Sequence, residues 1–106
     1  MLNQLHLAML ELYKGDAKRI QHFCKVHSYA KLIAECEKVD KETLFILEAA
    51  ALTHDIGIHL CEEKYGDCSG KLQEKEGPAI AARLLDELEF EKQVSERVQY
   101  LIAHHH

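Results

Sequence analysis

The fold of this chain is decided by one stretch, Leu44-Phe45-Ile46-Leu47-Glu48-Ala49-Ala50-Ala51-Leu52. Wound into a helix, its apolar residues cover nearly every side, which predicts a helix at the centre of a packed domain. Asp40 precedes the stretch and is a suitable N-cap, because its carboxylate can accept a hydrogen bond from the first turn. We expect this central helix to stop near Gly57.

Apolar residues recur at helical spacing in four other segments. They predict helices over residues 1–13, 17–37, 78–88 and 91–104. Asp16 is the expected N-cap of the second segment, and Pro78 is the expected first residue of the fourth. No segment shows the alternation of a strand, so the predicted fold is all-α, a bundle of about five helices.

Residues 58–73 separate the central helix from the segment that begins at Pro78. They include Gly66 and Gly70, which favour a loop with at most a short turn. A loop of this length is unusual in a small domain and often serves a ligand. We therefore expect it to border the functional site and to act as a substrate lid.

Composition limits the classes of function. The chain has 106 residues, of which 47% are apolar and 29% charged, as expected for one globular domain. Its net charge of −5, with both signs interspersed, argues against binding a nucleic-acid polymer. An anionic ligand would need a metal ion or a few local Lys or Arg residues to attract it.

Location in the cell is also suggested by the sequence. No signal peptide or membrane-spanning run is found, so we expect a cytoplasmic protein without membrane association. The four cysteines are expected to be reduced thiols, because a helix-rich chain without a secretory signal rarely carries disulfides. They are Cys24, Cys36, Cys61 and Cys68.

The dipeptide His54-Asp55 places an imidazole and a carboxylate at the end of the most apolar helix, where an unpaired carboxylate would be costly. Consecutive side chains on a regular helix point about 100° apart, so both can reach one centre only if the helix loosens, as Gly57 would permit. His22 lies at the margin of the apolar arc of the second helix, which must pack on the central one. A plainer interpretation makes these histidines core residues of an interaction scaffold that binds no metal.

Two stretches, Arg19-Ile20-Gln21-His22 and Ala50-Ala51-Leu52-Thr53-His54-Asp55-Ile56-Gly57, resemble the H…HD signature of the HD superfamily. Residues 76–81 and 100–105 resemble later segments of its small bacterial members, so the resemblance runs from about Ala17 onward. It implies an all-α, metal-dependent phosphohydrolase acting on a nucleotide or another phosphate ester. It also implies that His22, His54 and Asp55 are metal ligands.

The chain departs from the superfamily pattern at the fourth ligand, a later aspartate that has no counterpart here. Asp86 is the only aspartate after Asp67, and it falls in the wrong segment. We therefore expect a single HD-type domain over residues 1–106 that lacks the helix carrying the fourth ligand; alternatively, water completes the coordination.

A second metal ion is not favoured. Where two-metal members have a further histidine, this chain has Gln73, a poor ligand, although His104-His105 could match the histidine pair that follows. The last three histidines can also be explained as the start of an expression tag. His27 is expected to be a packed core histidine. His59, Cys61 and Cys68 match no standard zinc spacing.

Two imidazoles with a carboxylate suit a divalent transition metal ion, whether Mn, Fe, Co, Ni or Zn. Asp55 is the expected catalytic residue, because it could accept a proton from water besides binding the metal. The expected partner is a small phosphorylated substrate, with a nucleotide as one candidate, and a homo-oligomer could form through the first helix. The alternative is a regulatory module of the same fold that binds a metal or nucleotide without turnover.

Overall fold

The computed structural model describes residues 2–66 and 70–104, in which there are six α-helices and no strand. The all-α prediction is confirmed, with one helix more than expected. The chain forms two compact units, Met1–Thr53 and His54–His106. Within the described ranges, none of the helices has both the length and the apolar character that crossing a bilayer requires.

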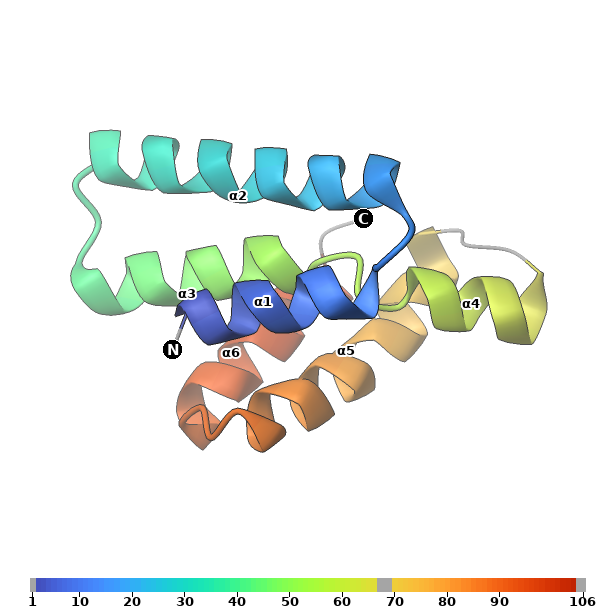
Figure 1. Cartoon of the computed structure of the whole chain (residues 1–106). Helices are drawn as coiled ribbons and strands as arrows, with labels where there is room; N and C mark the ends of the chain where they lie inside the picture. The colour runs from blue at the N-terminus through green and yellow to red at the C-terminus, as the bar shows by residue number, and fades with distance from the viewer. Residues whose placement is uncertain (1, 67–69, 105–106) are drawn as a thin grey trace. The chain divides into compact units, whose positions relative to one another are not determined.

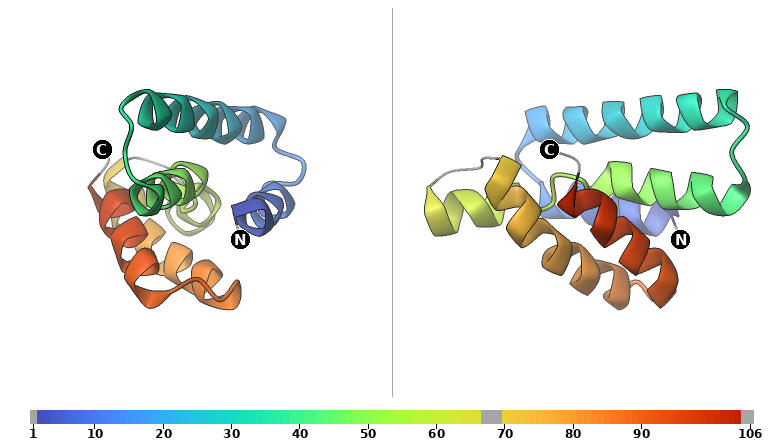
Figure 2. Two further views of the ribbon diagram at one scale, coloured as in Figure 1. Left: turned by 90° about the vertical axis from the view of Figure 1, so that its left-hand side faces the viewer. Right: turned by 180° about the vertical axis from the view of Figure 1, so that it is seen from behind.

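The first unit contains α1 (Leu2–Leu12), α2 (Ala17–Cys36) and α3 (Lys41–Thr53). Helix α3 packs against both α1 and α2, as the views in Figure 1 and Figure 2 show. Its buried residues are Ile46, Glu48, Ala49, Ala50, Ala51, Leu52 and Thr53. The prediction of a buried helix over residues 44–53 is therefore confirmed, since most residues of this segment are buried.

Both predicted N-caps are present in the first unit. Asp16 accepts a hydrogen bond from the backbone N–H of Arg19 at 3.4 Å, and its other carboxylate oxygen lies 2.9 Å from Arg19 Nη1. Asp40 accepts from the backbone N–H of Thr43 at 2.7 Å. Each cap satisfies a backbone N–H that has no partner within its own helix, so α2 and α3 begin where the sequence predicts.

The second unit contains α4 (Ile58–Tyr65), α5 (Gly70–Glu87) and α6 (Lys92–Ala103). Helix α5 packs along α6 and also contacts α4 (Figure 1). The buried apolar side chains include Ala81 and Leu85 of α5 and Val94, Val98 and Ile102 of α6. Apolar residues at helical spacing thus form the faces that α5 and α6 bury, as the sequence predicts for these two segments.

The prediction of a loop over residues 58–73 is wrong. Most of it is helical, because Ile58 and Cys61 are three positions apart and both buried, so α4 has an apolar face. Gly66, with φ of +68°, ends α4 in the left-handed conformation that glycine adopts without strain. Residues 67–69, which fall within the predicted loop, lie outside the described residues.

The prediction that Pro78 begins a helix is wrong, because Pro78 lies inside α5. A proline within a helix removes one backbone hydrogen bond and is normally unfavourable. The turns before it are nevertheless helical, since Gln73 and Gly77 are buried on the face that α5 turns inward. Tertiary packing of this first part of α5 therefore outweighs the local effect of Pro78.

Candidate functional site

His54 and Asp55 lie in the turn that follows α3. The helix ends at Thr53, and residues 54–57 form a turn before α4 begins at Ile58. His54 Nε2 lies 3.0 Å from Asp55 Oδ2, with the two side chains 15% and 17% exposed. Because residues 54 and 55 lie outside the regular helix, their side chains can reach one point. A regular helix would hold two consecutive side chains about 100° apart.

Gly57 has a role in this turn that the sequence did not indicate. Its φ of −82° and ψ of −4° are ordinary right-handed values, so the turn does not depend on glycine's conformational freedom. A Cβ at Gly57 would lie 3.3 Å from both the Cα and the N of Gly77 in α5. Gly57 therefore lets the backbone of the turn approach the backbone of α5 closely, where a side chain would need the neighbour to shift by a few tenths of an ångström.

The donor atoms of His54 and Asp55 fit a transition metal ion. Nitrogen and oxygen ligands lie about 2.0–2.2 Å from such an ion, so two adjacent ligand atoms are expected roughly 3 Å apart. The separation of 3.0 Å between Nε2 and Oδ2 agrees with this expectation. Imidazole nitrogen with carboxylate oxygen is a donor set that Mn, Fe, Co, Ni and Zn accept.

His22, the third predicted ligand, is an exposed residue of α2 in the first unit. It lines a groove of about 540 Å³ along α2, together with Lys18, Gln21, Cys24 and Lys25. Its ring is therefore accessible to a ligand. Because His22 belongs to one unit and His54 to the other, their joint binding of a metal stays a prediction.

Comparison with known families decides the identity of the fold. Residues 19–106 match the family described as the HD domain, a range that includes His22, His54 and Asp55. The chain belongs to the HD domain family. HD domains form a superfamily of metal-dependent phosphohydrolases, which bind divalent metal ions and act on phosphate esters. Neither comparison with curated proteins nor comparison with solved structures found a significant match.

A second group of titratable side chains lies inside the first unit of this HD domain. His27 Nε2 is 3.0 Å from Glu48 Oε1, and the ring of His6 meets that of His27 with 5.6 Å between centroids. His6 Nε2 also lies 3.3 Å from Cys24 Sγ. Burial, and then the charge of His27, lowers the pKa of His6. The sequence identified His27 as a packed residue but not Glu48, whose only signal was a carboxylate within an apolar stretch.

The remaining candidate ligands of the HD domain are placed as follows. Gln73, at the position of a second-metal histidine, is buried in α5. His104 Nδ1 lies 2.8 Å from the carbonyl oxygen of Tyr100, and its ring stacks on the Tyr100 ring at 4.2 Å between centroids. His105 lies outside the described residues, as do Cys68 and the side chain of His59.

The segment expected to form a lid is tied to α5. The Tyr65 hydroxyl donates a hydrogen bond to Glu76 Oε1 at 2.8 Å, and Lys64 Nζ approaches the same oxygen at 3.5 Å. The bond from Tyr65 is the main reason why the pKa of the Glu76 carboxyl is lowered. The end of α4 therefore makes polar contacts with α5, and the role of this segment as a substrate lid stays a prediction.

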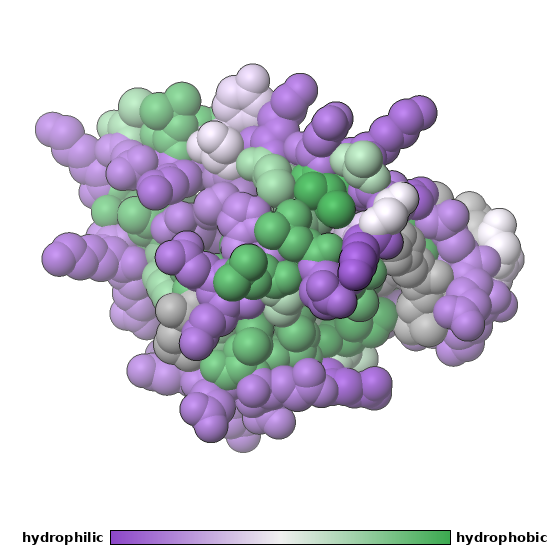
Figure 3. Space-filling model, viewed as in Figure 1, coloured by the Kyte–Doolittle hydropathy of each residue, from purple (hydrophilic) through white to green (hydrophobic). Residues whose placement is uncertain are grey.

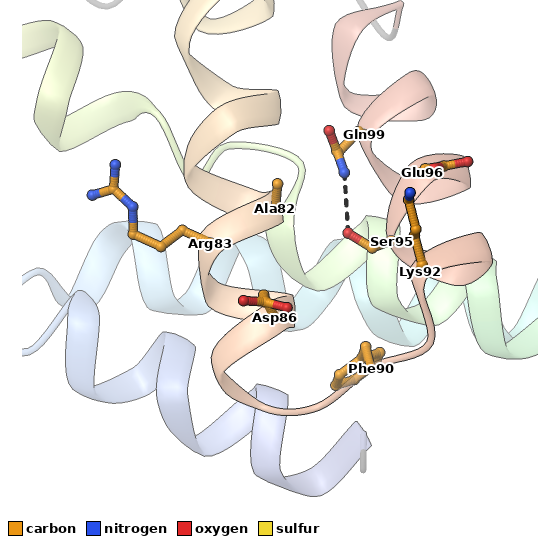
Figure 4. A pocket seen from close by; sticks show the side chains of 8 residues that line it. All are labelled: Ala82, Arg83, Asp86, Phe90, Lys92, Ser95, Glu96 and Gln99. Carbon is orange, nitrogen blue, oxygen red and sulfur yellow. Dashed lines mark hydrogen bonds between the residues drawn. The ribbon is translucent and has the colours of Figure 1, made fainter.

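A pocket of about 560 Å³ lies between α5 and α6 of the HD domain (Figure 4). Its lining residues are Ala82, Arg83, Asp86, Phe90, Lys92, Ser95, Glu96 and Gln99. Two cationic and two anionic side chains balance one another, and Figure 4 shows Arg83 extending away from α6. Such a lining has no net attraction for a phosphate, so it is not a candidate substrate site for this family.

Proposed function

We propose that this HD domain hydrolyses a phosphate ester of a small molecule, with a nucleotide as one candidate substrate. A divalent transition metal ion would be held by His22, His54 and Asp55. The observation that carries the proposal is the turn at residues 54–57, where His54 Nε2 and Asp55 Oδ2 are 3.0 Å apart within a chain of this family. The same two donors would serve adjacent positions on one ion.

The metal ion and the side chains of His54 and Asp55 would contribute different parts of the hydrolysis. When bound, a divalent ion supplies polarisation of a phosphoryl oxygen and lowers the pKa of water toward about 7. Asp55, 17% exposed, would accept the proton that the attacking water loses as its oxygen adds to phosphorus. The ester P–O bond breaks, and the leaving oxygen takes a proton from solvent and departs as the alcohol. His54 would hold the ion through Nε2, beside the Asp55 carboxylate.

Metal content is the first test. Protein in which His104, His105 and His106 are replaced by Ala should be analysed for bound metal, because three consecutive histidines can bind metal by themselves. We expect Mn, Fe, Co, Ni or Zn to be retained, or taken up after removal with a chelator, at about one ion per chain. A chain that takes up none of these ions would contradict the proposal and favour an interaction scaffold.

Turnover is the second test. The same protein should be assayed with p-nitrophenyl phosphate and with nucleoside monophosphates after each metal is added in turn. Hydrolysis that requires one of these ions, and that a chelator stops, is the expected result. Stoichiometric metal binding without hydrolysis of any of these substrates would instead identify a regulatory binding module. The two measurements therefore separate enzyme, binding module and scaffold.

A further inference from the structure

Helix α2 is locally basic in an acidic chain. Residues 17–34 include Lys18, Arg19, Lys25 and Lys31 and contain no Asp or Glu, although the net charge of the chain is −5. Figure 3 shows hydrophilic side chains projecting over the N-terminal half of α2 and an apolar group over its C-terminal end. The exposed apolar residues there are Leu32 and Ile33. The cationic character of α2 is thus concentrated on the half that carries His22.

The two lysines of the groove share one side of α2. Lys18 and Lys25 are seven residues apart, which places them within about 20° of each other around the helix axis. His22 is only about 40–60° away from either, and all three line the groove of about 540 Å³. The groove therefore presents two ammonium groups on the side of α2 that presents His22.

Neighbouring charges leave this pair available. Arg19 is balanced by Asp16, whose Oδ2 lies 2.9 Å from Arg19 Nη1. Among the residues that the structure describes, Lys18 and Lys25 make no ion pair or hydrogen bond through their side chains. A lysine ammonium offers three donors and a compact charge, which suits a phosphate oxygen.

We propose that Lys18 and Lys25 form an anion subsite that binds the dianionic phosphate of a phosphate monoester beside His22. This inference rests on the proposed hydrolase function and names the substrate class that the function would take. Two positive charges match a monoester, which carries about −1.5 to −2 near pH 7, better than a diester with a single charge. The pair also opposes the repulsion that a chain of net charge −5 exerts on an anion.

The first experiment measures kinetics with two probes, p-nitrophenyl phosphate and bis(p-nitrophenyl) phosphate. Lys18→Gln and Lys25→Gln should each raise KM for the monoester about three- to tenfold, with little change in kcat, because a charge-assisted contact of an exposed lysine is lost. The double variant should raise KM for the monoester more than for the diester. Added salt should raise the wild-type KM and affect the double variant less.

The matched control is Lys31→Gln. Lys31 is exposed on the same helix, but it lies about 120–140° around the axis from the other two lysines and does not line the groove. The Lys31→Gln substitution removes one positive charge from α2, as the other two substitutions do, without changing the proposed subsite. If Lys31→Gln raises the monoester KM as much as Lys18→Gln or Lys25→Gln does, the effect is one of net charge and the proposal is overturned.

A binding measurement separates this inference from the proposed function. Metal-free protein labelled with ¹⁵N should be titrated with inorganic phosphate while the amide signals of α2 are followed. Saturable shifts around residues 18–25 that the double variant weakens, and that Lys31→Gln preserves, would support the subsite even if no hydrolysis is found. Unchanged phosphate affinity in the double variant would overturn it, even if the protein proves to be a metal-dependent hydrolase.

Discussion

His27 of α2 and Glu48 of α3 form a polar contact inside the first unit, with His27 Nε2 lying 3.0 Å from Glu48 Oε1. The two side chains are 18% and 10% exposed, so the pair lies largely out of water. A carboxylate in this position needs a hydrogen-bond partner, and His27 is one. The contact connects a helix that carries His22 to the helix that ends at the His54-Asp55 turn.

Replacing Glu48 should destabilise the domain. Glu48→Ala leaves the largely buried His27 without this partner, and we expect a loss of about 1–3 kcal/mol in the free energy of unfolding. Glu48→Gln keeps an oxygen that can accept from His27 and should cost less. Urea denaturation followed by circular dichroism measures both. A Glu48→Ala protein as stable as the wild type would show that the contact contributes nothing to the fold.

His6 should make stability depend on pH. Burial, and then the charge of His27, lowers the pKa of folded His6 below the 6.5 of an ordinary histidine, so the unfolded chain binds a proton there more readily. The contribution of His6 is thus present above pH 6.5 and is lost as the pH falls below it. Urea midpoints at about pH 7.5 and about pH 5.5 should differ less in His6→Gln than in the wild type. Equal differences in the two proteins would refute this role.

Gly77 should tolerate no side chain. Gly77→Ala would normally stabilise a helix by about 1 kcal/mol, but here its Cβ would lie 2.9 Å from Ile102 Cγ2. We expect overpacking, at about 1–3 kcal/mol, to outweigh the helical gain and lower the melting temperature. In an Ile102→Ala background the Cγ2 is absent, so the penalty of Gly77→Ala should disappear. Additive effects of the two substitutions would mean that the steric conflict is not the cause.

Asp55 should be essential for turnover but not for the fold. Asp55→Ala removes both a proposed metal ligand and the proposed proton acceptor, so metal-dependent hydrolysis should fall by about a hundredfold or more. Metal retention should fall as well, while the helical circular dichroism signal stays near that of the wild type. Asp86→Ala, at an exposed aspartate of α5, is the matched control. Hydrolysis equal in the two variants would exclude Asp55 as the catalytic residue.

Local features were predictable from the sequence because their causes are local. Apolar residues at helical spacing predicted α1, α2, α3 and α6 closely, and the caps at Asp16 and Asp40 were read from the carboxylate that precedes each helix. His54-Asp55 could be recognised in the same way, since the two candidate ligands are consecutive. The matched family confirms the fold that this pattern implied.

Only the tertiary structure decided the features that depend on a distant partner. Helix α4 exists because Ile58 and Cys61 are buried, and Pro78 is accommodated inside α5 because the turns before it are packed; neither effect is visible in local propensity. Glycines at 57 and 77 look like breaks in the sequence, yet a Cβ at Gly57 would lie 3.3 Å from the Gly77 backbone, and a Cβ at Gly77 would lie 2.9 Å from Ile102 Cγ2. The sequence by itself determined α1, α2, α3 and α6 and named the candidate metal ligands, whereas packing determined α4, the first turns of α5 and which side chains meet, because contact energies depend on what the fold brings alongside.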